Sequence, residues 1–427
     1  MTKSNPAAIS LITALVLVLL SGCIDESFPT PTPIPTSIPA KLSTPIAIDR
    51  GNVHRTGLYD NAGTPQLTEV FWRYSLEDAA YVTVPIVEDG VLYFSGIKEP
   101  NSELHAIDTR TGRLLWKQET VRYSSTPTLS DGVLYYTDQT GLHALDTSTR
   151  KEKWNYAVRH GFDMSPAVQH EVVYFGDDRG NMHGIDSQTG EQKWSVKVGN
   201  SYTSDPALGD AKLYFAGDIA PLITGPDAHR QNSLYAVDIQ TGRQLWTFAP
   251  PDSELEYKFF YDVMEANGKV YTINSRGDFY GGDNYVYALD GTSGKQLWRY
   301  RPQQSAYNLA HIAANGDLLY VTAESRDNDN NSKAQIFAVD TATGQKRWTF
   351  EADGSFTAPS IAGGILYIAH HDKGIATIYA LDARTGKEQR SFKFDHMVTS
   401  PLVIDGDVLY LVVGNWNARP NYIFAIR

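Results

Sequence analysis

Cysteine, methionine and positive charge are all scarce in this chain of 427 residues. Its single cysteine, Cys23, excludes a disulfide framework and any zinc or iron–sulfur centre that needs several thiolates. Lys and Arg number 37 against 49 Asp and Glu, and this acidic balance argues against non-specific nucleic-acid binding, which needs basic residues to displace counterions. Aromatic residues are plentiful instead, with 25 Tyr, 16 Phe and 8 Trp, which indicates a protein rich in β-strands.

Residues 1–22 are predicted to be a signal peptide. The apolar stretch from Ala7 to Leu20 is short for a membrane span but suits the hydrophobic region of a secretory signal. It ends in Leu20-Ser21-Gly22-Cys23, which resembles the lipobox of bacterial lipoproteins. The resemblance implies cleavage before Cys23 and attachment of acyl chains such as palmitate there, which would hold the protein on a membrane. An ordinary secretory signal and an uncleaved anchor helix are the alternatives.

Residues 23–49 are predicted to be a lipid-anchored linker. Proline alternates with other residues from Pro29 to Pro35, and this pattern prevents both helix and sheet. A semi-stiff, polyproline-like tether between lipid and globule is the favoured interpretation. A Pro-rich ligand for a partner protein is the alternative.

One phrase returns along the rest of the chain, most clearly as Leu104-His105-Ala106-Ile107-Asp108-Thr109-Arg110-Thr111-Gly112 followed by Trp116. Its Asp recurs at intervals of 38 to 52 residues, a period typical of propeller blades or helical solenoids. Alternating apolar and polar residues with turn signals every 8–12 residues favour four short strands per repeat. The recurring Asp residues are Asp108, Asp146, Asp186, Asp238, Asp290, Asp340 and Asp382.

The ends of the chain predict how the ring closes. A tyrosine after Leu or Val marks the second strand of eight repeats, yet the chain stops in a third strand at residues 423–427. A strand without a repeat of its own, at residues 67–74, can supply the missing fourth strand and leave no edge unpaired. We therefore predict an all-β, eight-bladed β-propeller over residues 50–427, with four-stranded antiparallel blades and the N-terminal strand joining the last blade.

Tryptophans lie ten residues after a small residue in six repeats, as in the pair Ala288 and Trp298. This constant spacing predicts that each indole packs where a neighbour has no side chain larger than a methyl group. Arg150 stands where the turn of the second repeat should have Gly, so that turn is expected to be strained or reshaped. Arg390 replaces the Trp of the seventh repeat. The predicted structural docking residues are Trp72, Trp116, Trp154, Trp194, Trp246, Trp298 and Trp348.

The phrase Ala-x-Asp-x-x-Thr-Gly-x-x-x-Trp resembles the tryptophan-docking motif of the quinoprotein, or PQQ-like, β-propellers. The run from Gly51 to Gly57 resembles the short lead-in segment of the same superfamily. Eight blades and a lipobox are similar to the BamB-like lipoproteins, which are non-catalytic scaffolds in outer-membrane protein assembly. The resemblance implies a monomeric, lipid-anchored, extracytoplasmic scaffold for protein partners of the cell envelope, with no cofactor. It would lie on the outer face of the cytoplasmic membrane or the periplasmic side of an outer membrane.

Two other classes of function stay open. The same superfamily contains dehydrogenases that bind pyrroloquinoline quinone (PQQ) and calcium, but the vicinal Cys pair that this resemblance implies is impossible with Cys23 alone. The third hypothesis is a surface module that binds glycan or another ligand.

Several groups of polar residues have patterns that resemble catalytic or metal-binding sites. The recurring Asp residues are interpreted as turn caps, because an Asp side chain can bond the backbone two or three residues on. His105, His143 and His183 share a strand position with Tyr and Phe of other repeats, which favours packing over metal binding. Residues 327–331 offer alternating oxygen ligands but lack the Gly and Glu of a calcium loop, so a solvated loop is favoured over weak calcium binding. No catalytic, cofactor or metal residue is predicted.

Long loops of blades four, five, six and eight are predicted to gather on one face of the ring. Loops on a rigid scaffold concentrate function, and aromatic and Arg residues anchor interfaces. Local loop packing is the alternative. The candidate partner-binding residues are Arg230, Tyr257, Phe259, Tyr280, Trp416 and Arg419.

Overall fold

The computed structural model describes residues 46–427 apart from 60–62, 64, 99, 122–123, 159–163, 200–201, 220–232, 251–258, 276–283, 303–307, 327–331, 373 and 416–417. The residues described belong to one compact unit, residues 44–427, and the description below concerns this unit. None of the residues described forms a helix with the length and hydropathy needed to cross a membrane.

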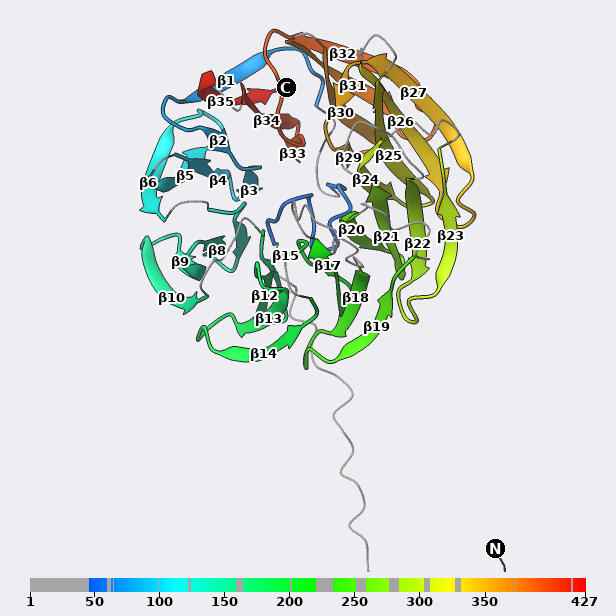
Figure 1. Cartoon of the computed structure of the whole chain (residues 1–427). Helices are drawn as coiled ribbons and strands as arrows, with labels where there is room; N and C mark the ends of the chain where they lie inside the picture. The colour runs from blue at the N-terminus through cyan, green and yellow to red at the C-terminus, as the bar shows by residue number, and fades with distance from the viewer. Residues whose placement is uncertain are drawn as a thin grey trace, which may run out of the picture. The chain divides into compact units, whose positions relative to one another are not determined.

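Eight antiparallel sheets stand around a central axis in this unit (Figure 1). Blade one contains β2 (Tyr81–Val82), β3 (Ile86–Glu88), β4 (Val91–Ile97), β5 (Ser102–Asp108) and β6 (Leu114–Thr120). Blade two contains β7 (Thr128–Ser130), β8 (Val133–Asp138), β9 (Gly141–Asp146) and β10 (Lys151–Ala157). Blade three contains β11 (Ala167–Gln169), β12 (Val172–Gly176), β13 (Asn181–Asp186) and β14 (Gln192–Lys197). Blade four contains β15 (Tyr202–Thr203), β16 (Ala207–Leu208), β17 (Lys212–Ile219), β18 (Ser233–Asp238) and β19 (Gln244–Phe248).

The second half of the ring repeats the arrangement. Blade five contains β20 (Phe259–Ala266), β21 (Lys269–Ser275), β22 (Tyr285–Asp290) and β23 (Gln296–Tyr300). Blade six contains β24 (Asn308–Asn315), β25 (Leu318–Arg326), β26 (Ser332–Asp340) and β27 (Lys346–Asp353). Blade seven contains β28 (Ser355–Phe356), β29 (Ser360–Ala362), β30 (Ile365–Asp372), β31 (Ile375–Asp382) and β32 (Glu388–Phe394). Blade eight contains β33 (Val403–Asp405), β34 (Val408–Asn415), β35 (Ala418–Ile426) and β1 (Val70–Leu76).

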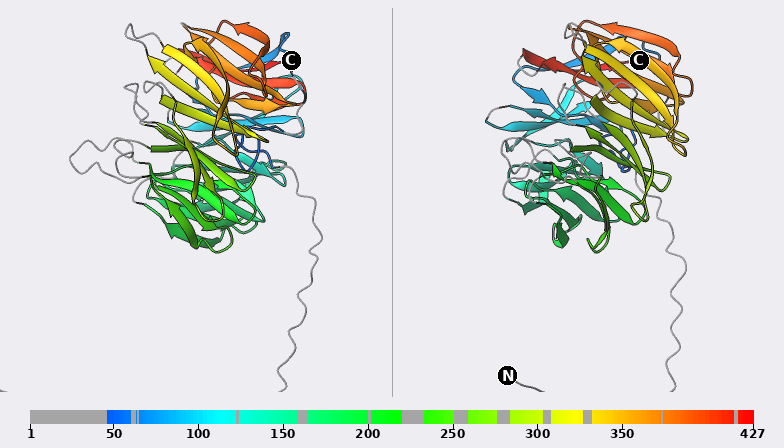
Figure 2. Two further views of the ribbon diagram at one scale, coloured as in Figure 1. Left: turned by 90° about the vertical axis from the view of Figure 1, so that its right-hand side faces the viewer. Right: turned by 45° about the vertical axis from the view of Figure 1, so that its right-hand side comes forward.

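Each blade runs from an innermost strand A to an outermost strand D, and the side views show the strands passing between the two faces of the ring (Figure 2). The prediction of eight four-stranded blades is confirmed. Strand A is divided into two short pieces in blades one, four and seven, both pieces pairing with the same strand B. Apolar side chains on both faces of the inner strands pack against adjacent blades, so the core is distributed between the blades.

Ring closure also follows the prediction. The N-terminal strand β1 pairs antiparallel with β35, the last strand of the chain, and Trp72 lies opposite Ala425. The backbone of Thr68 donates to the carbonyl of Arg427 at 2.6 Å, and the Arg427 guanidinium pairs with Glu69 at 2.8 Å. The two ends of the chain therefore complete one blade without a covalent connection.

The constant spacing of ten residues between the small residue and the tryptophan has a different cause from the predicted one. Ala288 is the cross-strand partner of Trp298 in the same blade, and on its other side it pairs with Tyr271. The Tyr and Trp rings meet over the alanine with centroids 6.0 Å apart. A small residue is needed there because two large rings share the space above it. The expectation that the small residue belongs to a neighbouring blade was wrong.

The contact between blades is made on a glycine of the next turn. Trp246 of blade four donates its indole N–H to the carbonyl of Gly291 in blade five at 3.2 Å. Its ring covers Gly294, where an added Cβ would lie only 2.6 Å from the indole. Six indoles dock in this way, with N–H to carbonyl distances of 2.7–3.2 Å: Trp72, Trp154, Trp194, Trp246, Trp298 and Trp348.

The indole docking differs in the two places where the sequence departs from the motif, at Arg150 and at Arg390. Arg150 keeps the backbone bond of the turn to Asp146 at 2.8 Å but does so with φ +58°, which confirms the expected strain. Trp116 lies beside Tyr93, with ring centroids 6.0 Å apart, and donates no indole hydrogen bond to any residue that the structure describes. In blade seven, Arg390 instead donates to the carbonyl of Gln66 at 3.3 Å. Blade eight has no turn between strands C and D, because those strands are the two chain ends, so no glycine is present there to receive an indole.

A matched pair of glycines in blade five tests this docking. Gly294 and Gly268 have similar φ values of +69° and +74°, but nothing lies within 4 Å of a Cβ added at Gly268. Gly268→Ala is expected to cost about 1 kcal/mol of backbone strain. Gly294→Ala is expected to cost about 2 kcal/mol more, because the methyl group overlaps Trp246. Urea unfolding of both variants measures the difference, and equal losses would contradict docking through the glycine.

Candidate binding site in the central channel

Most predicted partner residues cannot be placed. Arg230, Tyr257, Tyr280 and Trp416 lie outside the described residues, as does the predicted lipid-attachment residue Cys23. The backbones of Phe259 and Arg419 belong to β20 and β35, while their side chains are not described. The hypothesis of a partner-binding loop face therefore stays a prediction.

The three histidines of strand C are packing residues, as predicted. His105, His143 and His183 each stack on an aromatic ring of strand B, with ring centroids 4.8–5.0 Å apart. Burial lowers the pKa of His105 to about 4, so its imidazole is neutral at pH 7. Among the residues described, no cluster of His, Cys, Asp and Glu has a geometry that could hold a metal ion.

The recurring Asp residues cap the turns between strands C and D. In all seven turns, one carboxylate oxygen accepts the backbone N–H three residues on at 2.7–3.0 Å. Hydrogen bonds from Thr149 and Ser148 lower the pKa of Asp146 to about 2. These carboxylates are thus ionised and committed to turn structure.

Charged residues gather instead at the centre of the ring, on residues 46–59, which we term the axial strap (Figure 1). The strap exchanges two backbone hydrogen bonds between Ala47 and Leu129 of blade two. Its carbonyls then accept backbone N–H groups of blades four, five and six, from Leu208, Glu265 and Ala314, at 2.8–3.1 Å. It ends against Ile361 of blade seven. The strap therefore crosses the channel and pairs with the inner strands of five blades.

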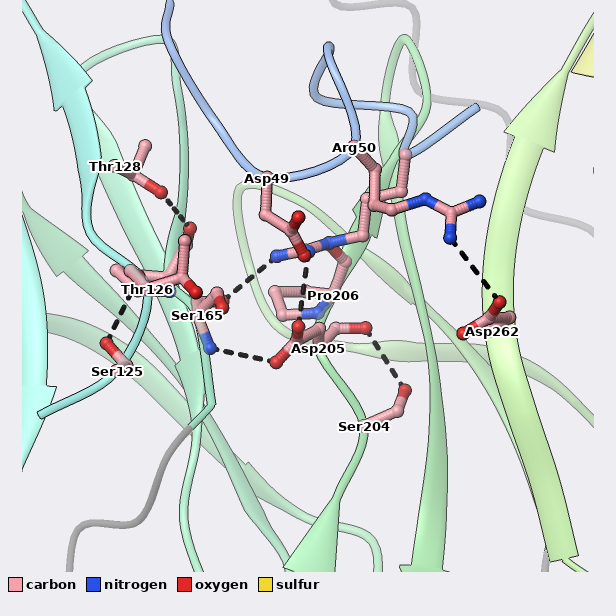
Figure 3. A network of polar contacts seen from close by, with 12 residues as sticks. Asp49, Arg50, Ser125, Thr126, Thr128, Ser165, Ser204, Asp205, Pro206 and Asp262 are labelled. Atoms are coloured by element: carbon pink, nitrogen blue, oxygen red, sulfur yellow. Dashed lines mark hydrogen bonds and ion pairs between the residues drawn. The ribbon is translucent and has the colours of Figure 1, made fainter. Parts of the chain in front are cut away.

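Arg55 of the strap bridges blades three and four. Its guanidinium donates to the carbonyls of Pro206 at 2.8 Å and Ser165 at 3.1 Å, which belong to the two blades. It also forms ion pairs with Asp205 at 3.2 Å and with Asp49 at 3.4 Å. Figure 3 shows the labelled acceptors gathered beneath the strap. The Arg55 side chain is only 5% exposed, so its guanidinium interacts with protein groups and not with solvent.

Arg50 and His54 bridge the next two seams. Arg50 donates to the carbonyl of Ile312 in blade six and lies 3.7 Å from Asp262 in blade five (Figure 3). His54 contacts the carbonyl of Leu208 in blade four, and its ring lies 2.9 Å from Glu265 in blade five. Together with Arg55, these side chains tie together four consecutive blades at the axis.

The carboxylates of the channel differ in their protonation. Burial raises the pKa of Asp205, and Arg55 only partly offsets that effect. Asp262 is partly buried, but His311 and Arg50 outweigh the effect of burial and lower the pKa of Asp262 to about 2. Asp262 lies in a β-bulge with φ +45°, an unfavourable conformation that aims its side chain toward the axis.

A cavity of about 380 Å³ lies against the strap. Its wall combines charged side chains with apolar ones, a combination typical of small-molecule sites. The lining residues are Asp49, Arg50, Arg55, Met164, Ser204, Asp205, Phe260, Asp262, Val263, Met264, His311 and Pro401.

No sequence pattern pointed to this site in advance. The lead-in noted above, Gly51 to Gly57, covers only part of the strap, and Asp49, Arg50, His54 and Arg55 were not singled out as site residues. The sequence signal that could have indicated this site was a dense group of charged residues before the first strand, in a segment too short to form a blade. Such charges on a solvated loop would look the same in the sequence, because burial depends on blades that follow much later.

Comparisons with known proteins identify the family. A family model described as outer membrane protein assembly factor BamB matches residues 100–280 and 282–415. The chain belongs to this BamB family. A search of curated protein sequences finds no match.

Solved structures share the BamB-family fold at low sequence identity. BamB from Moraxella catarrhalis is 14% identical with a TM-score of 0.58, covering 83% of this chain and 99% of that one. Quinohemoprotein alcohol dehydrogenase from Comamonas testosteroni is 17% identical with a TM-score of 0.65, covering 88% of this chain and 79% of that one. A computationally designed protein, Ika8, is 14% identical with a TM-score of 0.62, covering 82% of this chain and 98% of that one. These similarities show the fold alone.

The described channel residues do not fit the PQQ site that the resemblance to dehydrogenases implies. All seven described indoles belong to outermost strands, so none faces the channel to stack on a quinone ring. The two strap arginines are engaged with carbonyls and carboxylates of the blades. With Cys23 as the only cysteine, a vicinal pair cannot form either.

The contact between His54 of the strap and Glu265 is predicted to make a pH-dependent contribution to the free energy of unfolding. The hydrogen bond to Glu265 raises the pKa of His54 above its ordinary value of 6.5. The stabilisation is therefore complete below that value and is lost as the pH rises through the higher folded-state pKa. The difference in free energy of unfolding between wild type and His54→Gln should be greatest near about pH 5.5 and should shrink toward about pH 9.

Urea unfolding across this range gives the measurement. His396→Gln serves as the control, because the structure places His396 against Phe394, Phe424 and Tyr422, and no residue in the described part of the chain forms an ion pair with it. A difference at His54 that stayed constant, or grew, with rising pH would contradict the pairing with Glu265.

Proposed function

We propose that this BamB-family chain is a lipid-anchored, extracytoplasmic β-propeller that acts as a non-catalytic scaffold for protein partners of the cell envelope. The axial strap is the observation that supports a non-catalytic role. Its arginines and the carboxylates around them bridge blades, so the charged groups nearest the axis are structural. Binding would then fall to the loops at the rim of the ring.

The family description supports an envelope partner. The model matched by residues 100–280 and 282–415 is described as an outer membrane protein assembly factor. The lipobox and the Pro-rich linker at residues 23–49 agree with tethering to a membrane. A partner in outer-membrane protein assembly is therefore the first to test.

Lipid attachment is tested at Cys23. Wild type expressed in a bacterial host should incorporate radiolabelled palmitate and sediment with membranes. Cys23→Ser should lose the label and be released, because a signal alone leaves no acyl chain on the mature protein. Palmitate labelling that survives the substitution would contradict attachment at this residue.

The scaffold role is tested by site-specific photo-crosslinking in living cells. A photoreactive amino acid at Tyr257, Tyr280 or Arg419 samples the predicted loop face. Matched controls at Thr149 and Gln240 sample exposed turns between strands C and D. We expect one discrete crosslinked protein, enriched at least about fivefold on the loop positions, a ratio equivalent to about 1 kcal/mol of preference.

Two outcomes would overturn the proposal. Equal labelling from both sets of positions would remove the loop face as an interface. A quinone absorbance change and dehydrogenase activity after adding PQQ and calcium would favour the enzyme hypothesis, and binding on a glycan array without any protein crosslink would favour the ligand-binding module.

A further inference from the structure

His143 of blade two contacts carboxylates through both of its ring nitrogens. Nε2 lies 3.0 Å from Oδ1 of Asp138, and Nδ1 lies 2.8 Å from Oε2 of Glu152. An ionised carboxylate only accepts hydrogen bonds, whereas a neutral imidazole has one N–H group and one lone pair. Both contacts can therefore be hydrogen bonds only when the ring is a protonated imidazolium.

The other two histidines at this strand position lack the arrangement. Nε2 of His105 lies 3.5 Å from Glu103, and its Nδ1 shares a hydrogen bond with the Tyr74 hydroxyl at 3.1 Å. Nε2 of His183 lies 3.2 Å from Asp177, while its Nδ1 is buried without a partner among the residues described. Of these three blades, only blade two places a carboxylate within 3.0 Å of each ring nitrogen.

The imidazolium joins three strands of the blade. Asp138 is the last residue of β8 and is 1% exposed, and it also accepts the backbone N–H and the hydroxyl of Thr140, at 2.7 and 2.6 Å. Glu152 belongs to β10, the outermost strand. The ring of His143 therefore ties the short hairpin turn between β8 and β9 to β10. Without its proton, Asp138 would remain a buried carboxylate with no cation beside it.

Few other charges among the residues described act on His143. Tyr136 of β8 stacks on the ring, with centroids 5.0 Å apart, and burial raises the pKa of Tyr136 well above its ordinary value of 10.0, so this tyrosine is neutral. Lys151 and Lys153 of β10 are exposed, and the innermost strand β7 carries no titratable group. Blade one has Gln118, which is uncharged, at the strand D position where a tyrosine of the adjacent blade contacts the histidines of blades one and three. The charge on the ring therefore depends on the two carboxylates.

We propose that the hairpin of blade two is a pH-sensitive clasp, which the imidazolium of His143 holds closed and which loss of its proton releases. Burial lowers the pKa of His143, but the hydrogen bonds to Asp138 and Glu152 more than offset that effect and raise the pKa above its ordinary value of 6.5. The clasp is therefore fully closed below that value and opens as the pH rises through the higher folded-state pKa.

The position of the hairpin gives the clasp a consequence for binding. It connects strands B and C, so it lies on the same face of the ring as the long loops predicted to bind a partner. Release of the hairpin would change the shape of part of that face. This consequence rests on the proposed function, whereas the clasp itself is tested below without any partner.

NMR spectra of protein labelled with ¹⁵N-histidine measure the charge directly, and the signals are assigned with His143→Phe. We expect both ring nitrogens of His143 to be protonated at about pH 6 and one of them at about pH 9, with a midpoint above 6.5. His105, whose pKa burial lowers to about 4, should stay neutral throughout. A His143 ring with a single N–H group at about pH 6 would overturn the proposal.

Spin labels measure release of the hairpin. In Cys23→Ser protein, which has no other cysteine, a nitroxide is attached through Gln139→Cys at the tip of the blade-two hairpin. Arg179→Cys at the tip of the blade-three hairpin is the matched control, because His183 contacts only one carboxylate there. Raising the pH from about 6 to about 9 should shorten the rotational correlation time of the first label at least about twofold and leave the second unchanged. No change at Gln139→Cys, or an equal change at both positions, would overturn the proposal.

Two substitutions separate the clasp from packing alone. His143→Phe keeps an aromatic ring at a position that Phe337 occupies in blade six, and it should leave the label at Gln139→Cys mobile at every pH. Glu152→Gln should lower the midpoint of the transition by about 0.3–0.7 pH units, because one of the two ion pairs is lost. Glu191→Gln, which changes an exposed carboxylate of blade three, should leave the midpoint unchanged.

Glu152→Gln carries the test if His143→Phe does not fold, because the Glu152 side chain is 42% exposed. A midpoint in Glu152→Gln equal to that of the wild type would contradict the clasp.

Discussion

The packing of an indole on the glycine of the next blade is the interaction on which the ring depends. The glycine satisfies two requirements at once, because the turn needs a positive φ and the indole needs an empty Cβ position. A hydrogen bond from the indole to the same turn fixes the angle between blades. The alanine beneath the indole belongs to its own blade and allows the strand B tyrosine to reach the same turn. In blade four, Tyr214 and Trp246 both donate to the carbonyl of Gly291.

Ring closure modifies this interaction at one seam and reinforces it at the axis. Blade eight has chain ends where other blades have the docking turn, so Arg390 and Tyr367 bind the backbone of Gln66 and Pro65 instead. The axial strap adds a second set of bonds between blades, with Arg55, His54 and Arg50 each spanning one seam. Docking between neighbouring blades and bridging at the axis together hold the eight sheets in one ring.

Most of the fold could be predicted because the sequence pattern of a blade repeats along the chain. The strand B tyrosine identifies all eight blades, the Asp-containing turn identifies seven of them, and the unpaired strand with Trp72 identifies the closure. The strap could not be predicted, because it occurs once and has no periodicity. Arg55 meets Pro206, 151 residues away, and no local pattern encodes that contact. The origin of the ten-residue spacing was also misassigned, since spacing alone does not distinguish a cross-strand partner from a residue of the next blade.

Hydrogen exchange of the tryptophan indole N–H groups, followed by ¹⁵N NMR, tests the docking most directly. Trp72, Trp154, Trp194, Trp246, Trp298 and Trp348 donate to the next blade, so their indole protons should exchange only when the ring opens. Trp116 has no indole hydrogen bond among the residues described and should exchange markedly faster than these six. Equal protection of Trp116, or rapid exchange at all seven positions, would contradict the account of a ring held together by indoles on glycine turns.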